Sequence, residues 1–199
     1  MEKGAEMARW FSWGPSLSFK GRKFKGLRGF AGKPAHPPLT DFPVTAYILV
    51  GIFDLISFVK GEQSRTATDF FRAATYVLIA GGGVSLVTAL TGFWDWLKST
   101  PKHTQVWRTA NSHMALMLTT TVIVLIDIVL RLSYWDEGYA ELPVLILSLL
   151  ALALVSIGAA YGGSLVYEYG FNVENATDLP QYHESETDIY AYQKDASHQ

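Results

Sequence analysis

The 199-residue chain contains no cysteine. This absence excludes disulfide bonds, iron–sulfur clusters held by thiolates, covalently attached c-type haem and a thiol nucleophile. Charged residues are also scarce, at 17% of the chain against about 25% in soluble domains. Motifs of hydrolases and phosphate-binding proteins, such as Gly-x-Ser-x-Gly, the phosphate loop and His-Glu-x-x-His, are missing as well. We therefore do not expect a hydrolytic enzyme, whereas a redox role stays open.

Apolar residues replace the missing charge, and they gather in four blocks. Hydrophobic residues make up 49% of the chain, and the mean hydropathy is +0.16. Each block is long enough to cross the roughly 30 Å hydrocarbon core of a bilayer as a helix. The blocks predict spans at about 42–59, 70–97, 106–133 and 142–169. The expected fold class is therefore all-α, an integral membrane bundle of four transmembrane helices.

The two ends of the chain are polar and differ in charge. The first 41 residues hold eight Lys or Arg against three acids, with aromatic residues between them, whereas acids outnumber the single Lys194 after Gly170. We predict a basic aromatic arm over 1–35, a membrane domain over 36–170 and an acidic tail over 171–199. The arm is expected to lie on anionic headgroups or over a partner subunit. A basic segment beside a membrane is ordinary, so it does not call for nucleic acid as a partner.

Four prolines lie in the segment from Lys33 to Pro43, which leads into the first span. Their fixed φ predicts a stiff, extended segment that holds His36 just outside the membrane. Thr40 or Asp41 is expected to cap the helix that follows.

The distribution of positive charge predicts the orientation. Four spans place both ends of the chain on the same side as the loop over 98–105. That side carries twelve of the sixteen Lys and Arg when Arg108 is included. Because positive residues favour the cytoplasmic side, both termini are expected in the cytoplasm.

Polar side chains at membrane depth mark candidate sites, because they are costly there. His113 is the only histidine inside a predicted span, and at 100° per residue it shares a helix face with Thr109, Met117, Thr120 and Asp127. This face should contact other helices. Further polar groups are expected toward the same cytoplasmic leaflet, namely His36, Asp95, His103, Arg108, Asn111, Tyr161, Tyr167 and Glu168.

A second polar set is expected toward the outer side. Asp127 and Arg131 are four residues apart and can pair on one helix face. Asp54 would need Arg72 or Arg131 from another span as its partner. We expect an ion-pair cluster that locks the helices, and an ion path through a small transporter is the alternative.

Five motifs occur in a fixed order along the chain. They are His36-Pro-Pro-Leu-x-x-Phe-Pro, Phe53-Asp54-Leu55, Gly92-x-x-Asp95-Trp96, Arg108-x4-His113 and Gly162-Gly163-x-Leu165-Val166-Tyr167-x-x-Gly170. Over about residues 33–173 the chain resembles the membrane family called domain of unknown function 2231 (DUF2231). The resemblance implies the four-span fold and a prokaryotic cytoplasmic membrane. It implies no settled activity.

Three functional hypotheses follow. The first is a non-catalytic accessory subunit of a larger membrane complex, in respiratory or photosynthetic electron transfer, because an aromatic arm and tail flank a small bundle. The second is a b-type haem between His36 and His113, with Arg108 near a propionate and Gly162 and Gly163 beside the ring. The third is a quinone or proton site. No other metal site is expected.

The haem hypothesis has a structural alternative. A single intramembrane histidine could simply donate a hydrogen bond to Asp95, a tyrosine or a backbone carbonyl, and His36 could cap a turn. Small residues could then serve helix packing alone, as the pair Gly158 and Gly162 predicts for the last span. Under every hypothesis the expected partners are the lipid bilayer and other membrane subunits.

Overall fold

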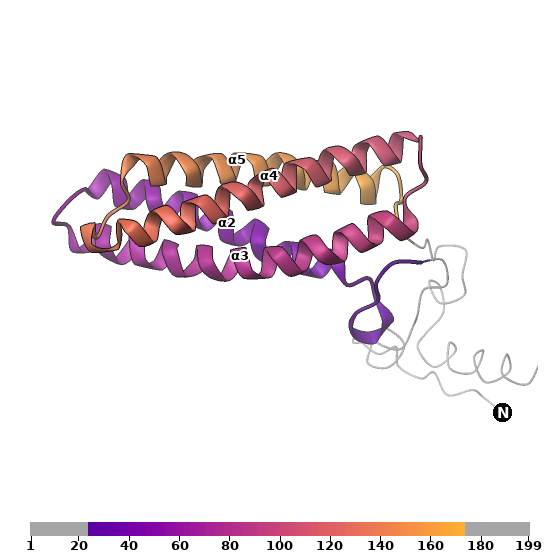
Figure 1. The fold of residues 1–199 in the computed structure, drawn as a ribbon, viewed down its shortest axis with the longest axis horizontal. Coiled ribbons are helices and arrows are strands. Elements are labelled where there is room, and N and C mark those ends of the chain that lie inside the picture. The colour runs from indigo at the N-terminus through magenta and orange to yellow at the C-terminus, as the bar shows by residue number, and fades with distance from the viewer. Residues whose placement is uncertain (1–23, 174–199) are drawn as a thin grey trace, which may run out of the picture.

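The computed structural model describes residues 24–173 and is all-helical over that range (Figure 1). Its long helices are α2 (His36–Lys60), α3 (Arg65–Ser99), α4 (Gln105–Ser133) and α5 (Leu142–Tyr167). The short 3-10 helices η1 (Phe30–Gly32) and η2 (Trp135–Glu137) lie in the connections. Each long helix is long and apolar enough to cross a membrane, which confirms the predicted all-α, four-span fold class.

The long helices form an antiparallel bundle in which consecutive helices are neighbours. α2 packs on α3 and α5, α4 packs on α3 and α5, and α2 and α4 lie on a diagonal without backbone contact. We call the end where α2 begins and α3 ends the histidine end, and the opposite end the ion-cluster end. A small apolar core lies between the helices, formed by Ala46, Tyr47, Val50, Ala74, Leu78, Val124, Ala151 and Val155. Large apolar side chains also cover the outer surface, as expected where lipid is the solvent.

The expectation of an extended segment over 33–43 is wrong, because α2 begins at His36. Pro37 and Pro38 lie in its first turn, where a backbone N–H would have no helical acceptor and its loss costs little. Thr40 does not cap the helix, since its hydroxyl donates to the carbonyl of Pro37 at 2.6 Å. The prolines therefore start the helix instead of preceding it.

Pro43 lies inside α2, where it removes one helical hydrogen bond. The carbonyl left without its usual donor is that of Leu39, four residues earlier. Thr88 Oγ1 of α3 donates to this carbonyl at 3.2 Å. The neighbouring helix thus satisfies the oxygen that the proline exposes.

Residues 24–35 fold back against the end of α3. Asp95 is buried there, with 6% of its surface exposed, and its Oδ1 accepts the Leu27 amide at 2.9 Å. Gly26 lies so close that a Cβ would be 2.1 Å from the same oxygen. The Leu27 carbonyl in turn accepts the amide of Ala35, the residue before α2, at 2.9 Å. Asp95 therefore ties the chain that leads into α2 to the end of α3.

The three consecutive glycines of α3 differ in their surroundings. A Cβ at Gly81 would lie 2.7 Å from the Cβ of Ala46 in α2, whereas a Cβ at Gly83 would meet nothing within 4 Å. Gly82 faces Val124 and Ile128 of α4. Gly81 therefore allows a close approach between α2 and α3.

We predict opposite effects for alanine at two of these glycines. Gly81→Ala should lower the free energy of unfolding by about 1–3 kcal/mol, because two helix backbones must move apart. Gly83→Ala, the control in the same helix, should leave stability unchanged or raise it by up to about 1 kcal/mol through helix propensity. The helical circular dichroism signal during unfolding in mixed detergent micelles measures both. Equal effects would contradict the packing of α2 on α3.

A second prediction concerns Asp95. Asp95→Ala should speed tryptic cleavage at Lys25 and Arg28 by about ten- to a hundredfold, because a hydrogen bond to a charged acceptor is worth about 1.5–3 kcal/mol. Asp95→Asn keeps an acceptor oxygen and should have a smaller effect. The control is Asp69→Ala, which removes an exposed acid of α3 in a surface pair with Arg65. If Asp95→Ala and Asp69→Ala are cleaved at the same rate, Asp95 does not hold the segment.

Candidate functional site

Two histidines from diagonal helices converge at the histidine end. His36 is the first residue of α2, and His113 lies about two turns into α4. Although the two helices have no backbone contact, the two imidazoles lie within electrostatic range of each other. Both side chains are half-buried. Sequence reasoning singled out these two residues but did not predict that they lie near each other. The structure places both of them at the histidine end.

Each imidazole is fixed by a backbone carbonyl of a neighbouring helix, α3 for His36 and α5 for His113. His36 Nδ1 lies 3.0 Å from the carbonyl oxygen of Thr88 in α3, and His113 Nδ1 lies 2.8 Å from that of Gly158 in α5. A carbonyl only accepts, so each Nδ1 carries the proton and donates it. In a neutral ring the other nitrogen, Nε2, then carries a free lone pair. Within residues 24–173, neither Nε2 takes part in a hydrogen bond.

Glycines allow both rings to lie directly against a helix backbone. A Cβ at Gly92 of α3 would be 2.6 Å from His36 Cε1, and a Cβ at Gly162 of α5 would be 3.2 Å from His113 Cε1. Gly163 is different, since its Cβ would meet only the Tyr167 ring, at 4.0 Å. Of the two adjacent glycines of α5, only Gly162 therefore contacts a histidine.

Two α3 residues at this site, Thr88 and Thr91, were missed by sequence reasoning. Thr91 Oγ1 donates to the Thr88 carbonyl at 2.9 Å and lies 3.4 Å from His36 Nδ1. Nearby, Trp96 Nε1 donates to Asn111 Oδ1 at 2.9 Å and joins α3 to α4. A usable signal was the spacing of Thr88, Thr91 and Gly92, which lie three and four residues apart and so share one helix face.

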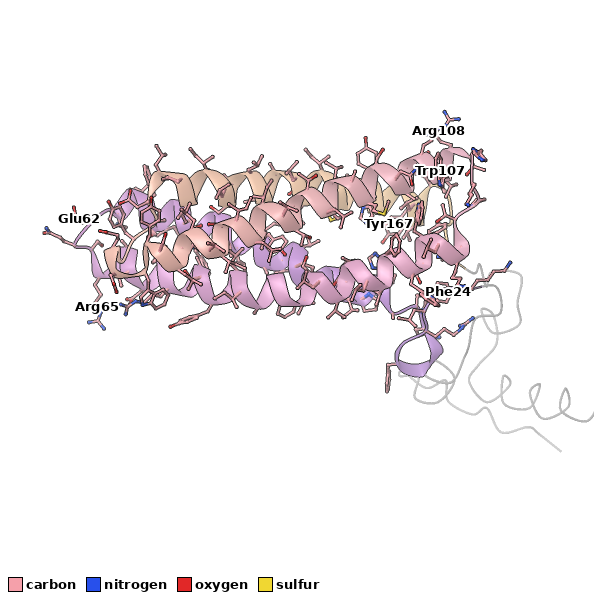
Figure 2. All side chains as sticks on the ribbon, in the orientation of Figure 1. Phe24, Glu62, Arg65, Trp107, Arg108 and Tyr167 are labelled. Atoms are coloured by element: carbon pink, nitrogen blue, oxygen red, sulfur yellow. The ribbon has the colours of Figure 1, made fainter. Side chains whose placement is uncertain are left out.

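The other polar residues expected in this leaflet do not join the pair. Arg108 is exposed at the start of α4, and its side chain projects away from the bundle (Figure 2). Tyr167, the last residue of α5, is 89% exposed, and Asp95 is engaged by Leu27. His103 lies in the loop with its ring 5.8 Å from that of Trp107. Contact of Arg108 with a propionate stays a prediction.

The ion-cluster end contains Asp54, Asp127 and Arg131, all buried. Arg131 Nη1 donates to Asp54 Oδ1 at 3.0 Å, and Nη2 donates to Asp54 Oδ2. Arg131 also donates from Nε to Asp127 Oδ1 at 3.1 Å and from Nη2 to Asp127 Oδ2 at 3.2 Å. The pairing of Asp127 with Arg131, and of Asp54 with one of two named arginines, was predicted and is present.

Two further groups complete this end. The ring of Phe71 in α3 lies 5.8 Å from the guanidinium carbon of Arg131, a cation–π contact. Ser57 is fully buried, donates to the Ala67 carbonyl at 2.8 Å and accepts the Ala140 amide at 3.0 Å. One hydroxyl thus connects α2 to the start of α3 and to the loop before α5. Nothing in the sequence around Ser57 distinguishes it from other serines in the spans.

Comparison with known proteins gives a family but no relative. No curated protein and no solved structure shows significant similarity to the chain. A family profile described as a predicted membrane protein (DUF2231) matches residues 32–175, a stretch that includes the histidine pair and the ion cluster. Because this match covers most of the chain, and because the structure has four helices able to span a membrane, the protein belongs to the DUF2231 family of predicted membrane proteins.

Proposed function

We propose that this multi-pass membrane protein binds one b-type haem between His36 and His113 and transfers electrons at the membrane. The observation that carries the proposal is the convergence of two imidazoles with the same arrangement. In each, Nδ1 is held by a carbonyl and Nε2 is free within the described part of the chain.

The donor set fits a haem better than a bare metal ion. Residues 24–173 contain no group of three or more His, Cys, Asp or Glu that could hold a metal ion. Two imidazoles alone suit an iron whose other four ligands belong to a macrocycle. Ligating histidines usually donate their second ring nitrogen to a carbonyl or carboxylate, as both rings do here. A bound haem would supply a one-electron iron couple.

Each of the four helices has a part in this proposal. α2 and α4 supply the two ligands, and α3 and α5 supply the carbonyls of Thr88 and Gly158. These carbonyls fix the orientation of the rings and make the lone pair of Nε2 a stronger ligand for a metal. Gly92 and Gly162 let the rings approach the backbone. If the termini are cytoplasmic and the membrane is a prokaryotic cytoplasmic one, as expected from the sequence, the site lies in the cytoplasmic leaflet.

A role as accessory subunit of a respiratory or photosynthetic complex is compatible with this proposal. Its basis is the basic arm and the acidic tail, most of which lie outside the described residues. The small-transporter alternative has less support. All four carboxylate oxygens of Asp54 and Asp127 accept hydrogen bonds from Arg131, so the cluster already contains its own cation.

We predict a haem spectrum for the detergent-purified protein after expression with added haem precursor. The oxidised protein should show a Soret band, and dithionite should produce sharp α and β bands. His36→Ala and His113→Ala should each lose the low-spin spectrum. His103→Ala removes a histidine of the loop between α3 and α4, whose ring lies against that of Trp107, and should keep it. A folded, monodisperse wild-type protein without a Soret band would end the proposal.

We also predict a difference between adjacent glycines of α5. Gly162→Val should lower haem affinity by about ten- to a hundredfold, because the new side chain displaces a ligand ring from its hydrogen-bonded position. Gly163→Val adds the same side chain one residue later, where the space is open, and should leave the affinity near that of the wild type. Haem titration of the apoprotein measures both. Equal losses would mean that contact with His113 is not what matters.

A further inference from the structure

The ion cluster has an unbalanced charge. It contains two carboxyl groups and one guanidinium, and their side chains are at most 1% exposed. If both carboxyl groups were ionised, the cluster would carry a net charge of −1 with no access to water. An uncompensated charge inside a protein costs several kcal/mol, and a buried group usually becomes neutral instead.

No second cation faces the carboxyl groups from the described residues. Arg131 donates to both carboxyl groups, and the nearby hydroxyl of Ser148 in α5 is uncharged. From α3 the uncharged ring of Phe71 lies 5.8 Å from the guanidinium carbon of Arg131. Arg72, the next residue of α3, is exposed, and its guanidinium carbon lies 5.5 Å from the Trp135 ring.

The geometry also limits what can balance the charge. Within residues 24–173 no group of three or more His, Cys, Asp or Glu could hold a metal ion, so a metal cation is not the expected counter-charge. Arg131 Nη2 donates to Oδ2 of both Asp54 and Asp127, which brings these two oxygens to the same nitrogen. Two carboxyl groups held this close favour sharing a single proton, because their negative charges repel.

We propose that Asp54, Asp127 and Arg131 form a proton-binding site that holds one proton at neutral pH, mainly on Asp127. Asp54 is the better ion-pair partner, because both terminal nitrogens of Arg131 donate to it. Asp127 shares Nη2 with Asp54 and receives its two bonds at 3.1 and 3.2 Å. The proton makes the cluster neutral. This site is independent of haem and is testable in haem-free protein.

Infrared spectroscopy tests the site directly. The wild-type protein at neutral pH should show the C=O stretching band of a protonated carboxylic acid, shifted to lower frequency in deuterium oxide. Asp127→Asn should lose this band, because an amide at this position leaves Arg131 and Asp54 as a neutral pair. Asp69→Asn, which alters an exposed acid of α3, should keep it. Absence of the band from the folded wild-type protein would overturn the proposal.

The pH dependence of unfolding gives a second readout. If only the folded state holds the proton, the folding equilibrium constant falls about tenfold for each unit by which the pH rises. This continues until the pH is high enough for the folded cluster to release the proton. Compared with Asp127→Asn, the wild type should therefore lose stability as the pH rises through neutrality. Identical slopes in the two proteins would contradict the proposal. If Asp127→Asn does not fold, loss of the wild-type infrared band on raising the pH decides the question.

Asp54→Asn separates the two carboxyl groups. It removes the partner of both terminal nitrogens of Arg131, so it should be less stable than Asp127→Asn at every pH. The reverse order would place the proton on Asp54 and overturn the assignment to Asp127.

Discussion

The ion pair between Arg131 and Asp54 joins two helices that have no backbone contact with each other. α2 and α4 face each other across the diagonal of the bundle, and Arg131 extends from α4 to Asp54 of α2. Asp54 follows His36 by 18 residues, and Arg131 follows His113 by 18 residues. Eighteen residues are five full helical turns, about 27 Å. On α2 the histidine and the ion-pair residue therefore share one helix face, and the same holds on α4.

The two ends solve the same problem with different chemistry. In a bilayer a polar group must find its partner within the protein, because lipid offers none. At the ion-cluster end the partners are charges, and every carboxylate oxygen is bonded. At the histidine end the partners are backbone carbonyls, and each ring keeps one nitrogen unbonded within the described residues. The first arrangement bonds every carboxylate oxygen, whereas the second leaves one ring nitrogen of each histidine without a hydrogen bond among the described residues.

The parts of this structure that were predictable depend on spacing within one helix. Four apolar blocks predicted the four helices, and the four-residue interval between Asp127 and Arg131 predicted their ion pair. The start of α2 was not predictable in this way, because Pro37 and Pro38 suit both an extended segment and a first helical turn. The carbonyl partners of the histidines were also hidden. Every residue has a carbonyl, so only the packing of four helices selects the two that are used.

The segment before α2 has a consequence for how the molecule can respond to its surroundings. Hydrogen bonds lead from Asp95 through Leu27 to Ala35, and the next residue is His36. Docking of the arm and the position of His36 are therefore thermodynamically linked. Any surface or protein that binds the arm more tightly in one position of His36 favours that position, and a ligand on His36 changes the affinity of the arm by the same factor. Residues 24–35 and His36 are thus coupled through Asp95.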